Sequence, residues 1–325
     1  MHGRAVVFIE LAIVGLAVLI ATVLFDVRAI LSTPTAERFI PEALLPQQPV
    51  TIMFVGDVML GRLVRQRMRA NGADYPFEKL GTLFADVDAV VANLEGPITL
   101  LDAPDTRVSP EQPFSMRFAF DPESAGALAR AGITHVSLAN NHALDQGSQG
   151  EEDTIVYLTD AAIAPFGQGN ETPLGTTAHV TRHGRDIQFI GLDATATSHD
   201  WGAVKDALKE ISEETTVVVF MHWGNEYETM HSVEQETIAR TLITAGADAI
   251  IGAHPHVTQD IQNIDGVPVF YSLGNFIFDQ YWNESVRDGF AVKLIIDGDD
   301  ISYETIPITR EYGSVQPYIE SAVTL

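Results

Sequence analysis

Short apolar runs that end abruptly in a glycine or a polar residue recur along most of the chain. This pattern predicts β-strands over residues 50–55, 87–92, 133–138, 187–192, 216–221, 249–251 and 267–273. Amphipathic segments between them predict helices after Arg62, from an Asp121 N-cap through Ala131, and over residues 151–162 and 233–245. Residues 290–308 predict a β-hairpin that turns at Asp297-Gly298-Asp299. The alternation of strands and helices therefore predicts one α/β domain over residues 50–325.

The amino-terminal segment has a different pattern. Residues 5–25 are apolar except for Glu10 and Thr22, and at about 1.5 Å per residue a helix of this length crosses a bilayer core of about 30 Å. Asp26, Val27 and Arg28 follow in place of a small-residue cleavage site, which favours an uncleaved anchor over a removed signal peptide. We predict an anchor over residues 1–28, a tether over 29–49, and a single-pass cell-membrane protein whose carboxyl-terminal domain is extracytoplasmic.

Composition limits the chemistry of the domain. The chain has 44 acidic against 19 basic residues, a net charge of −25, so it lacks the basic stripe that nucleic acid requires. The acidity suits either solubility or adaptation to high salt. Because the chain has no cysteine, disulfides, thiolate zinc sites and a cysteine nucleophile are excluded. Any metal ion must therefore be held by His, Asp, Glu or Asn side chains.

Metal-competent side chains follow five of the predicted strands. They are Asp57, then Asn93 and Glu95, then Asn140, Asn141 and His142, then His222, and finally His254 and His256. The carboxyl ends of parallel strands share one edge of a sheet, so these side chains are expected to meet there. Imidazoles, carboxylates and amide oxygens suit zinc, manganese or iron. The sequence thus predicts one or two divalent ions, as in two-metal hydrolytic centres.

Individual roles follow from residue type. Glu95 is the best candidate for a carboxylate that bridges two ions, with Asp57 as a terminal ligand. His142 is placed either to ligate an ion or to protonate a leaving group. Asp145 and Glu226 are either acceptors that orient imidazoles or solvated loop charges. Arg62 either meets an anionic substrate group or pairs with a surface acid.

Six short strings carry a family resemblance. They are Gly56-Asp57-Val58-Met59-Leu60-Gly61-Arg62, Asn93-Leu94-Glu95-Gly96-Pro97, Ala139-Asn140-Asn141-His142-Ala143-Leu144-Asp145, His222-Trp223-Gly224-Asn225-Glu226-Tyr227, Ala253-His254-Pro255-His256-Val257 and Tyr271-Ser272-Leu273-Gly274-Asn275-Phe276. In this order the chain resembles the capsule-synthesis CapA family, which includes components of poly-γ-glutamate synthesis, over about residues 50–296. The resemblance implies a metallophosphoesterase-like two-sheet β-sandwich flanked by helices, in four α/β/β/α layers, in a membrane-anchored envelope protein.

The resemblance also assigns site residues by position. Asp57 matches the first aspartate of the phosphoesterase motif, and Glu95 stands near its bridging aspartate. His142 matches the catalytic histidine, and the remaining matched ligands are Asn141, His222, His254 and His256. Asn93, Asn140 and Asn275 lie in the matching strings as residues that support the ligands or contact substrate. One departure is plain, because Met59 stands where phosphoesterases carry a ligand histidine, and a thioether is a poor ligand for a hard divalent ion.

Two functions follow from these observations. The first is a subunit that, with other membrane components, supports synthesis or export of an anionic envelope polymer such as poly-γ-glutamate, using a metal-containing cleft. The alternative is a metal-dependent hydrolase of a phosphoester, a γ-glutamyl bond or another envelope-polymer bond, with metal-bound hydroxide as nucleophile and His142 as acid. Met59 favours the first function, and the retained set of histidines favours the second.

Overall fold

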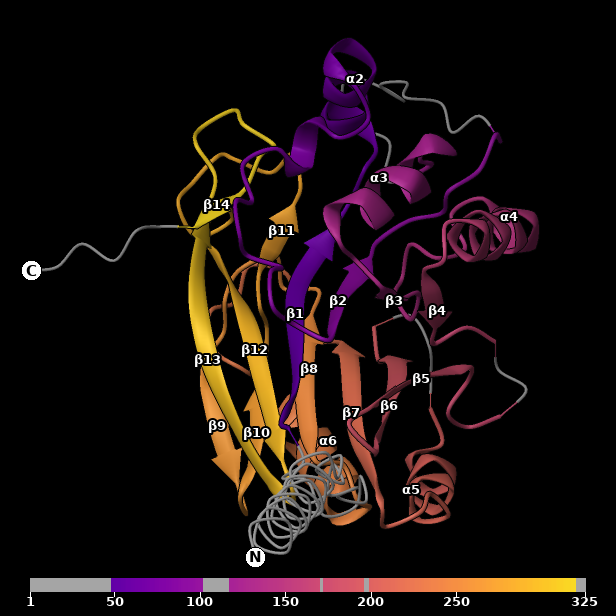
Figure 1. The fold of residues 1–325 in the computed structure, drawn as a ribbon, viewed down its shortest axis with the longest axis vertical. Coiled ribbons are helices and arrows are strands. Elements are labelled where there is room, and N and C mark those ends of the chain that lie inside the picture. Colours follow the sequence, from indigo (N-terminus) through magenta and orange to yellow (C-terminus); the bar gives the residue numbers. More distant parts are fainter. Residues whose placement is uncertain (1–47, 102–116, 170–171, 196–198, 320–325) are drawn as a thin grey trace, which may run out of the picture. The chain divides into compact units, whose positions relative to one another are not determined.

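Two β-sheets face each other in the computed structural model, which describes residues 48–101, 117–169, 172–195 and 199–319 (Figure 1). The first sheet has the strand order β14-β13-β12-β1-β2-β3-β4, and β11 pairs with β1 outside this path. Its strands are β1 (Val50–Val58), β2 (Ala89–Leu94), β3 (His135–Ser137), β4 (Ala164–Phe166), β11 (Asn275–Ile277), β12 (Gly289–Asp297), β13 (Asp300–Thr309) and β14 (Tyr318–Ile319).

The second sheet has the order β5-β6-β7-β8-β10-β9. Its strands are β5 (Thr177–Arg182), β6 (Arg185–Asp193), β7 (Thr215–His222), β8 (Ala249–Ala253), β9 (Ile261–Ile264) and β10 (Val267–Phe270). Side chains from both sheets fill the space between them, and the edge of the Phe54 ring meets Phe189 at 6.0 Å between centroids. This shared apolar layer fixes the two sheets against each other.

Helices cover the outer face of each sheet. Met68 of α2 (Arg62–Asn71), Leu128 of α3 (Glu123–Ala131) and Leu158 of α4 (Gly147–Asp160) are buried in one core with side chains of the first sheet. A short 3-10 helix, η2 (Tyr75–Phe77), joins the same side. Val204 of α5 (Trp201–Lys209) and Leu242 of α6 (Val233–Thr244) are buried with side chains of the second sheet. The predicted two-sheet α/β fold is therefore confirmed.

In each sheet, parallel strands place their carboxyl ends at the same edge. β1, β2 and β3 are mutually parallel, as are β6, β7 and β8 in the other sheet. In register, Asp57 lies beside Asn93 on β2, and Asp193 lies beside His222 on β7. The functional side chains predicted at the strand ends therefore start from neighbouring positions.

Most predicted elements form, and the differences have local causes. The hairpin of β12 and β13 turns through Gly298-Asp299 between paired Asp297 and Asp300, as predicted. Asp121 does not cap α3 through its side chain, because its carboxylate binds Arg65 and Arg69 of α2 instead. Helix α5, absent from the prediction, begins at an Asp200 N-cap whose carboxylate accepts from two backbone amides.

The predicted anchor lies outside the described residues, together with nearly all of the predicted tether. Within the ranges that the structure describes, no helix combines the length and apolar character needed to span a membrane. Residues from Gln48 onward form one compact unit.

Candidate metal centre

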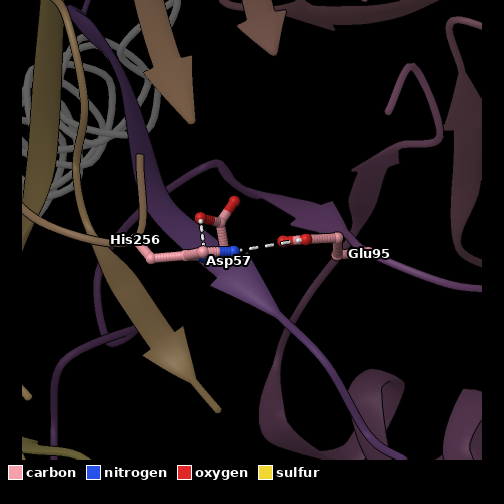
Figure 2. Close-up of side chains that lie close together, drawn as sticks. All are labelled: Asp57, Glu95 and His256. Carbon is pink, nitrogen blue, oxygen red and sulfur yellow. Dashed lines mark ion pairs between the residues drawn. The ribbon is translucent and has the colours of Figure 1, made fainter. Parts of the chain in front are cut away.

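Asp57, Glu95 and His256 converge at the end of β1, and we call this group the carboxylate half (Figure 2). One ligand atom from each residue lies within 4.8 Å of the others. Nδ1 of His256 is 3.3 Å from Oδ2 of Asp57, and Nε2 is 3.7 Å from Oε1 of Glu95. Two carboxylates and an imidazole form a donor set that suits a divalent ion.

Glu95 shows that these residues fit an ion. Its side chain is fully buried, and neither carboxylate oxygen has a hydrogen-bond partner among the described residues. Burial raises the pKa of Glu95 well above its usual range. Burial lowers the pKa of His256, but the charges of Glu95 and Asp57 outweigh it and raise that pKa to about 9. A buried carboxylate without hydrogen bonds is costly, and a cation held by these three side chains would offset that cost.

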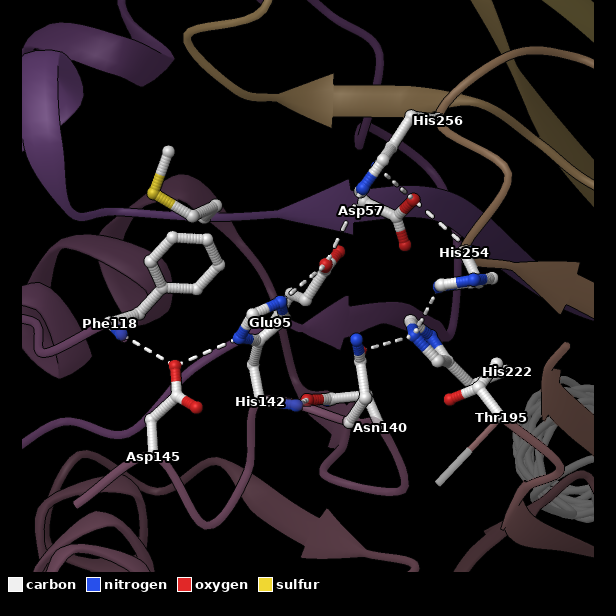
Figure 3. A network of polar contacts seen from close by, with 12 residues as sticks. Asp57, Glu95, Phe118, Asn140, His142, Asp145, Thr195, His222, His254 and His256 are labelled. Atoms are coloured by element: carbon white, nitrogen blue, oxygen red, sulfur yellow. Dashed lines mark hydrogen bonds and ion pairs between the residues drawn. The ribbon is translucent and has the colours of Figure 1, made fainter. Parts of the chain in front are cut away.

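His222, His254 and Asn141 form a second group, the imidazole half (Figure 3 shows both histidines). Nε2 of His222 is 3.1 Å from Nδ1 of His254 and 2.9 Å from Oδ1 of Asn141. Burial, followed by the neighbouring imidazoles, lowers the pKa of His222 well below its usual range and also lowers that of His254. Both rings are therefore neutral at pH 7, the state in which imidazole binds metal.

Asp57 and Asn93 connect the two halves. Oδ1 of Asp57 accepts a 2.8 Å hydrogen bond from Nδ2 of Asn93, and Oδ2 accepts from the backbone amide of His254 at 3.3 Å. The same Nδ2 of Asn93 lies 3.3 Å from Nδ1 of His222, and its Oδ1 accepts from Asn140. Asn93 thus contacts a residue of each half.

His142 lies beside the carboxylate half and outside the imidazole half. Its Nδ1 is 2.8 Å from Oδ2 of Asp145, and its Nε2 is 3.9 Å from Oε1 of Glu95. The ring packs against Phe118 at 4.2 Å between centroids, and Oδ1 of Asn140 accepts from the His142 backbone amide. Asp145 therefore directs Nε2 of His142 toward the centre, an arrangement typical of proton transfer.

The backbone around the centre adopts conformations that side chains usually avoid. His254, His256, Tyr227 and Arg62 all have positive φ, at 97°, 59°, 66° and 47°. Such conformations cost of order 1–3 kcal/mol each and cluster at functional sites. The amide of Tyr227 donates to the carbonyl of Pro255, between the two histidines, which holds this strained loop together.

Close backbone approach explains one glycine of the first motif. A Cβ on Gly56 would lie 1.8 Å from the carbonyl oxygen of Gly274, so no other residue fits where β1 passes this segment. The approach places Asn275 next to the centre. Its Oδ1 is 3.0 Å from Nδ1 of His256, and its Nδ2 donates to the His256 carbonyl and to Gln280. Asn275 is thus a positioning residue for His256.

Arg62 and Glu226 lie at the margin of the site. The Arg62 guanidinium pairs with Asp279 and lies 5.1 Å from the Phe118 ring centroid. Of the two roles left open for Arg62 by the sequence, this contact represents pairing with an acid. Glu226 is exposed and forms no hydrogen bond with a site imidazole in the described part of the chain. Its charge adds to the burial that raises the pKa of Glu95 and partly offsets the burial that lowers the pKa of His254. Glu226 is therefore a long-range influence on the centre.

Several contributors were not predicted. Asp279 and Gln280 lie shortly after the string that ends at Phe276, so their closeness to that string was the available signal. Phe118 does not follow a predicted strand, so the sequence gave no signal that it would lie at the site. Met59 is fully buried in the core outside the first sheet, and its sulfur accepts from the amide of Gly61 at 3.0 Å. The residue in the expected histidine position thus serves packing and the turn into α2.

Solved structures place the fold in a class. A phosphatase from Mycoplasma pneumoniae matches 81% of this chain and 94% of its own, with a TM-score of 0.52 and 14% identity. A hypothetical protein from Thermus thermophilus matches 79% of this chain and 99% of its own, with a TM-score of 0.51 and 17% identity. The chain therefore shares the two-sheet α/β fold of these two structures, one of which is a phosphatase.

Sequence comparison then gives the family. Residues 51–280 match the family described as bacterial capsule synthesis protein PGA_cap, and the chain belongs to this family. It is 30% identical to the capsule biosynthesis protein CapA of Bacillus anthracis over 83% of this chain and 70% of that protein. It is 29% identical to the PGA biosynthesis protein CapA of Bacillus subtilis strain 168, over 81% of this chain and 72% of that protein. The predicted CapA resemblance is thus confirmed.

Proposed function

We propose that the chain is a membrane-anchored envelope protein that supports synthesis or export of an anionic polymer such as capsular poly-γ-glutamate, with one or two divalent ions in its cleft. Family membership supports a role with such a polymer, because the names of the family and of the two relatives refer to capsule or PGA biosynthesis. The buried carboxylate of Glu95, which has no hydrogen-bond partner among the described residues, supports the ions and is the observation that carries the proposal.

Each half has a donor set for one ion. Asp57, Glu95 and His256 would hold a harder ion such as manganese, whereas Asn141, His222 and His254 suit zinc or iron. Bound ions would supply positive charge that attracts an anionic group into a protein of net charge −25. Metal analysis of the full chain by mass spectrometry tests this proposal, which requires at least one bound ion per chain under metal-replete conditions.

The contact between His142 and Asp145 favours a second candidate function, metal-dependent hydrolysis of a phosphoester or γ-glutamyl bond. Asp145 fixes the His142 ring at 2.8 Å, and Nε2 then points toward the carboxylate half, where it can deliver a proton to a leaving group. Asn140 holds the backbone of His142 at the same time. Neither contact is needed to bind an ion, so this arrangement serves proton transfer.

A matched pair of variants tests this candidate. His142→Ala should retain its metal and lose roughly 10²–10⁴-fold in the rate of hydrolysis of an activated phosphodiester or a γ-glutamyl oligomer. His179→Ala, on partly exposed β5, should keep the full rate. If both variants support normal polymer production in cells and neither substrate is cleaved by the parent chain, the role in polymer synthesis is non-catalytic.

The membrane anchor is part of the same proposal and rests on the apolar segment 5–25. Protease protection in intact cells should leave residues 50–325 accessible from outside. Copurification with other membrane components of polymer synthesis should depend on residues 1–28. Protection of the domain from external protease would contradict the proposed orientation.

A further inference from the structure

Tyr227 and Trp282 form an exposed aromatic pair beside the carboxylate half. Tyr227 is 44% exposed and Trp282 is 57% exposed. The Tyr227 ring lies 6.1 Å from the ring of His256, measured between centroids. A ring that is accessible to solvent and adjoins a candidate metal ligand is placed to contact a molecule bound at the centre.

The Tyr227 ring is held from several directions. Its φ of 66° is unusual for a bulky residue, and its backbone amide donates to the carbonyl of Pro255 at 2.8 Å. Its hydroxyl accepts from Nε2 of Gln280 at 3.3 Å, and Oε1 of Gln280 accepts from Asn275, which positions His256. A braced ring on strained backbone points to a function at this position.

Trp282 supplies a second wall. Its ring lies 5.8 Å from the Tyr227 ring between centroids, and the two planes meet at 72°. We call these two rings, together with the carboxylate of Glu226, the aromatic corner. Because the walls are nearly perpendicular, one small group can contact both rings. The π faces of such rings carry partial negative charge, which attracts a cation.

The carboxylate of Glu226 adds a full negative charge to the corner. Glu226 is exposed, and its carboxylate accepts a hydrogen bond from the Tyr227 hydroxyl. Burial, and then the charge of Glu226, raise the pKa of Tyr227, so this hydroxyl stays neutral at pH 7. The charge of Glu95 acts on the same hydroxyl, but Glu95 belongs to the carboxylate half, where a bound ion would offset it.

The arginines around the corner already have acidic partners. Arg62, whose charge also acts on the corner tyrosine, pairs with Asp279. Arg287, on the same loop as the corner tryptophan, lies 3.9 Å from Glu284. Glu226 itself forms no ion pair within the described part of the chain. The corner therefore keeps a negative charge that a cationic ligand would balance.

An ammonium group suits the corner better than an apolar ring or a hydroxyl group. An apolar ring would pack against the two walls but leave the charge of Glu226 unbalanced. A hydroxyl would donate to Glu226 but gain little from the π faces. An ammonium group gains from both the carboxylate and the π faces. Since bound metal ions would attract an anion, the matching ligand carries an anionic group beside an ammonium group.

We propose that the aromatic corner binds the ammonium group at the amino end of the anionic polymer, while a carboxylate of the same terminal residue lies at the metal centre. The proposal rests on the function proposed above and specifies the part of the polymer that the site recognises. At the amino end of a polyglutamate chain, an ammonium group and a carboxylate share one carbon atom. Internal residues carry a carboxylate without an ammonium group, and the charge of Glu226 disfavours them.

Calorimetry on the full chain loaded with Mn²⁺ at pH 7 tests the proposal with short γ-linked glutamyl oligomers. An oligomer with a free amino end should bind roughly tenfold or more tightly than the same oligomer acetylated at that end, because acetylation removes the positive charge. Trp282→Ala should remove most of this preference, and Trp282→Phe should restore part of it. Tyr312→Ala, at another exposed aromatic residue, and Glu234→Gln, at an exposed acid of α6, should preserve it.

Two results of this titration would overturn the proposal. One is equal affinity for the free and the acetylated oligomer, which would leave the function proposed for the centre intact. The other is a preference for the free amino end that Trp282→Ala does not reduce, because a bound metal ion would then bind the amine directly.

A second measurement separates the corner from the metal centre. Tetramethylammonium, observed by saturation-transfer NMR on the metal-free chain, should bind the parent chain and bind more weakly to Trp282→Ala and to Glu226→Gln. Such binding without metal-dependent binding of either oligomer would support the ammonium site and contradict the function proposed for the centre. Absence of tetramethylammonium binding, or equal binding of tert-butanol or methyl glucoside, would overturn the ammonium site.

Discussion

In the carboxylate half an imidazole lies between two carboxylates, whereas in the imidazole half two imidazoles meet an amide oxygen. The charges around His256 raise its pKa to about 9, so without metal it carries a proton at pH 7. Burial and mutual proximity lower the pKa values of His222 and His254, so those rings carry none. Without an ion, the carboxylate half therefore holds a proton on His256, whereas the imidazole half presents neutral rings whose free ring nitrogens can bind a metal.

This difference implies different conditions for binding metal. An ion that enters the carboxylate half must displace a proton, whereas the imidazole half is already deprotonated. The halves also differ in the hardness of their donors, which favours manganese in one and zinc or iron in the other. Three experiments test whether they behave as two sites or as one.

The largest expected effect comes from Asp57→Asn, because Asp57 touches both halves through His256 and the backbone of His254. Affinity for ions in both halves should fall by more than the roughly 10–100-fold that the loss of a supporting hydrogen bond costs. Mass spectrometry of metal content checks this result, with Asp206→Asn on exposed α5 as control. Loss of a single ion would show that Asp57 serves only one half.

Glu95→Gln and His222→Ala should separate the halves. Glu95→Gln removes a charge from the carboxylate half and should lower manganese affinity by about 10–100-fold or more, with little change for zinc. His222→Ala should do the reverse, because it removes an imidazole from the other half. Titration of each variant with each metal measures both effects. Equal losses in all four titrations would indicate one coupled site.

The smallest effect is that of pH on the parent chain. Manganese affinity in the carboxylate half should rise by about tenfold or more per pH unit from pH 7 to about 9, because a proton leaves His256 when the ion binds and the raised pKa of Glu95 acts in the same direction. Zinc affinity in the imidazole half should be nearly constant over the same range, because the lowered pKa values of His222 and His254 leave no proton to displace. An equal change of manganese and zinc affinity with pH would contradict the inferred difference between the two halves.

The stability of the metal-free chain should also depend on pH, in the directions set by the pKa shifts of these histidines. The raised pKa of His256 means that its ion pairs stabilise the folded state fully below pH 6.5 and lose this contribution as pH rises through about 9. The lowered pKa values of His222 and His254 have the opposite sign, so their contribution is present above pH 6.5 and is lost as pH falls. Thermal unfolding of chelator-treated protein across pH 5–9 measures both slopes.

The sequence was informative where a strand end set the geometry. His222 and His254 follow β7 and β8, whose parallel pairing brings them together, so the strand pattern predicted their meeting. Asp57 ends β1 of the other sheet, and its contact with His254 depends on how the two sheets pack.

The sequence was less informative where side chains compete for partners. Asp121 reads as a helix cap, but two arginines of α2 bind its carboxylate, and only the packing of α2 beside it reveals this. The pocket lined by Asn140, Asp193 and Asp200 was not predicted either, because its lining residues are brought together only by the tertiary fold.

The contact between Asp57 and the amide of His254 joins positions 197 residues apart in the sequence. Contacts of such high sequence separation form late in folding, since a long loop must close first. Neither half is complete until β8 and its following loop dock against β1, so an amino-terminal fragment has no centre to load. An ion bound by this centre would therefore be selected in the compartment where folding finishes, by whichever metals are available there.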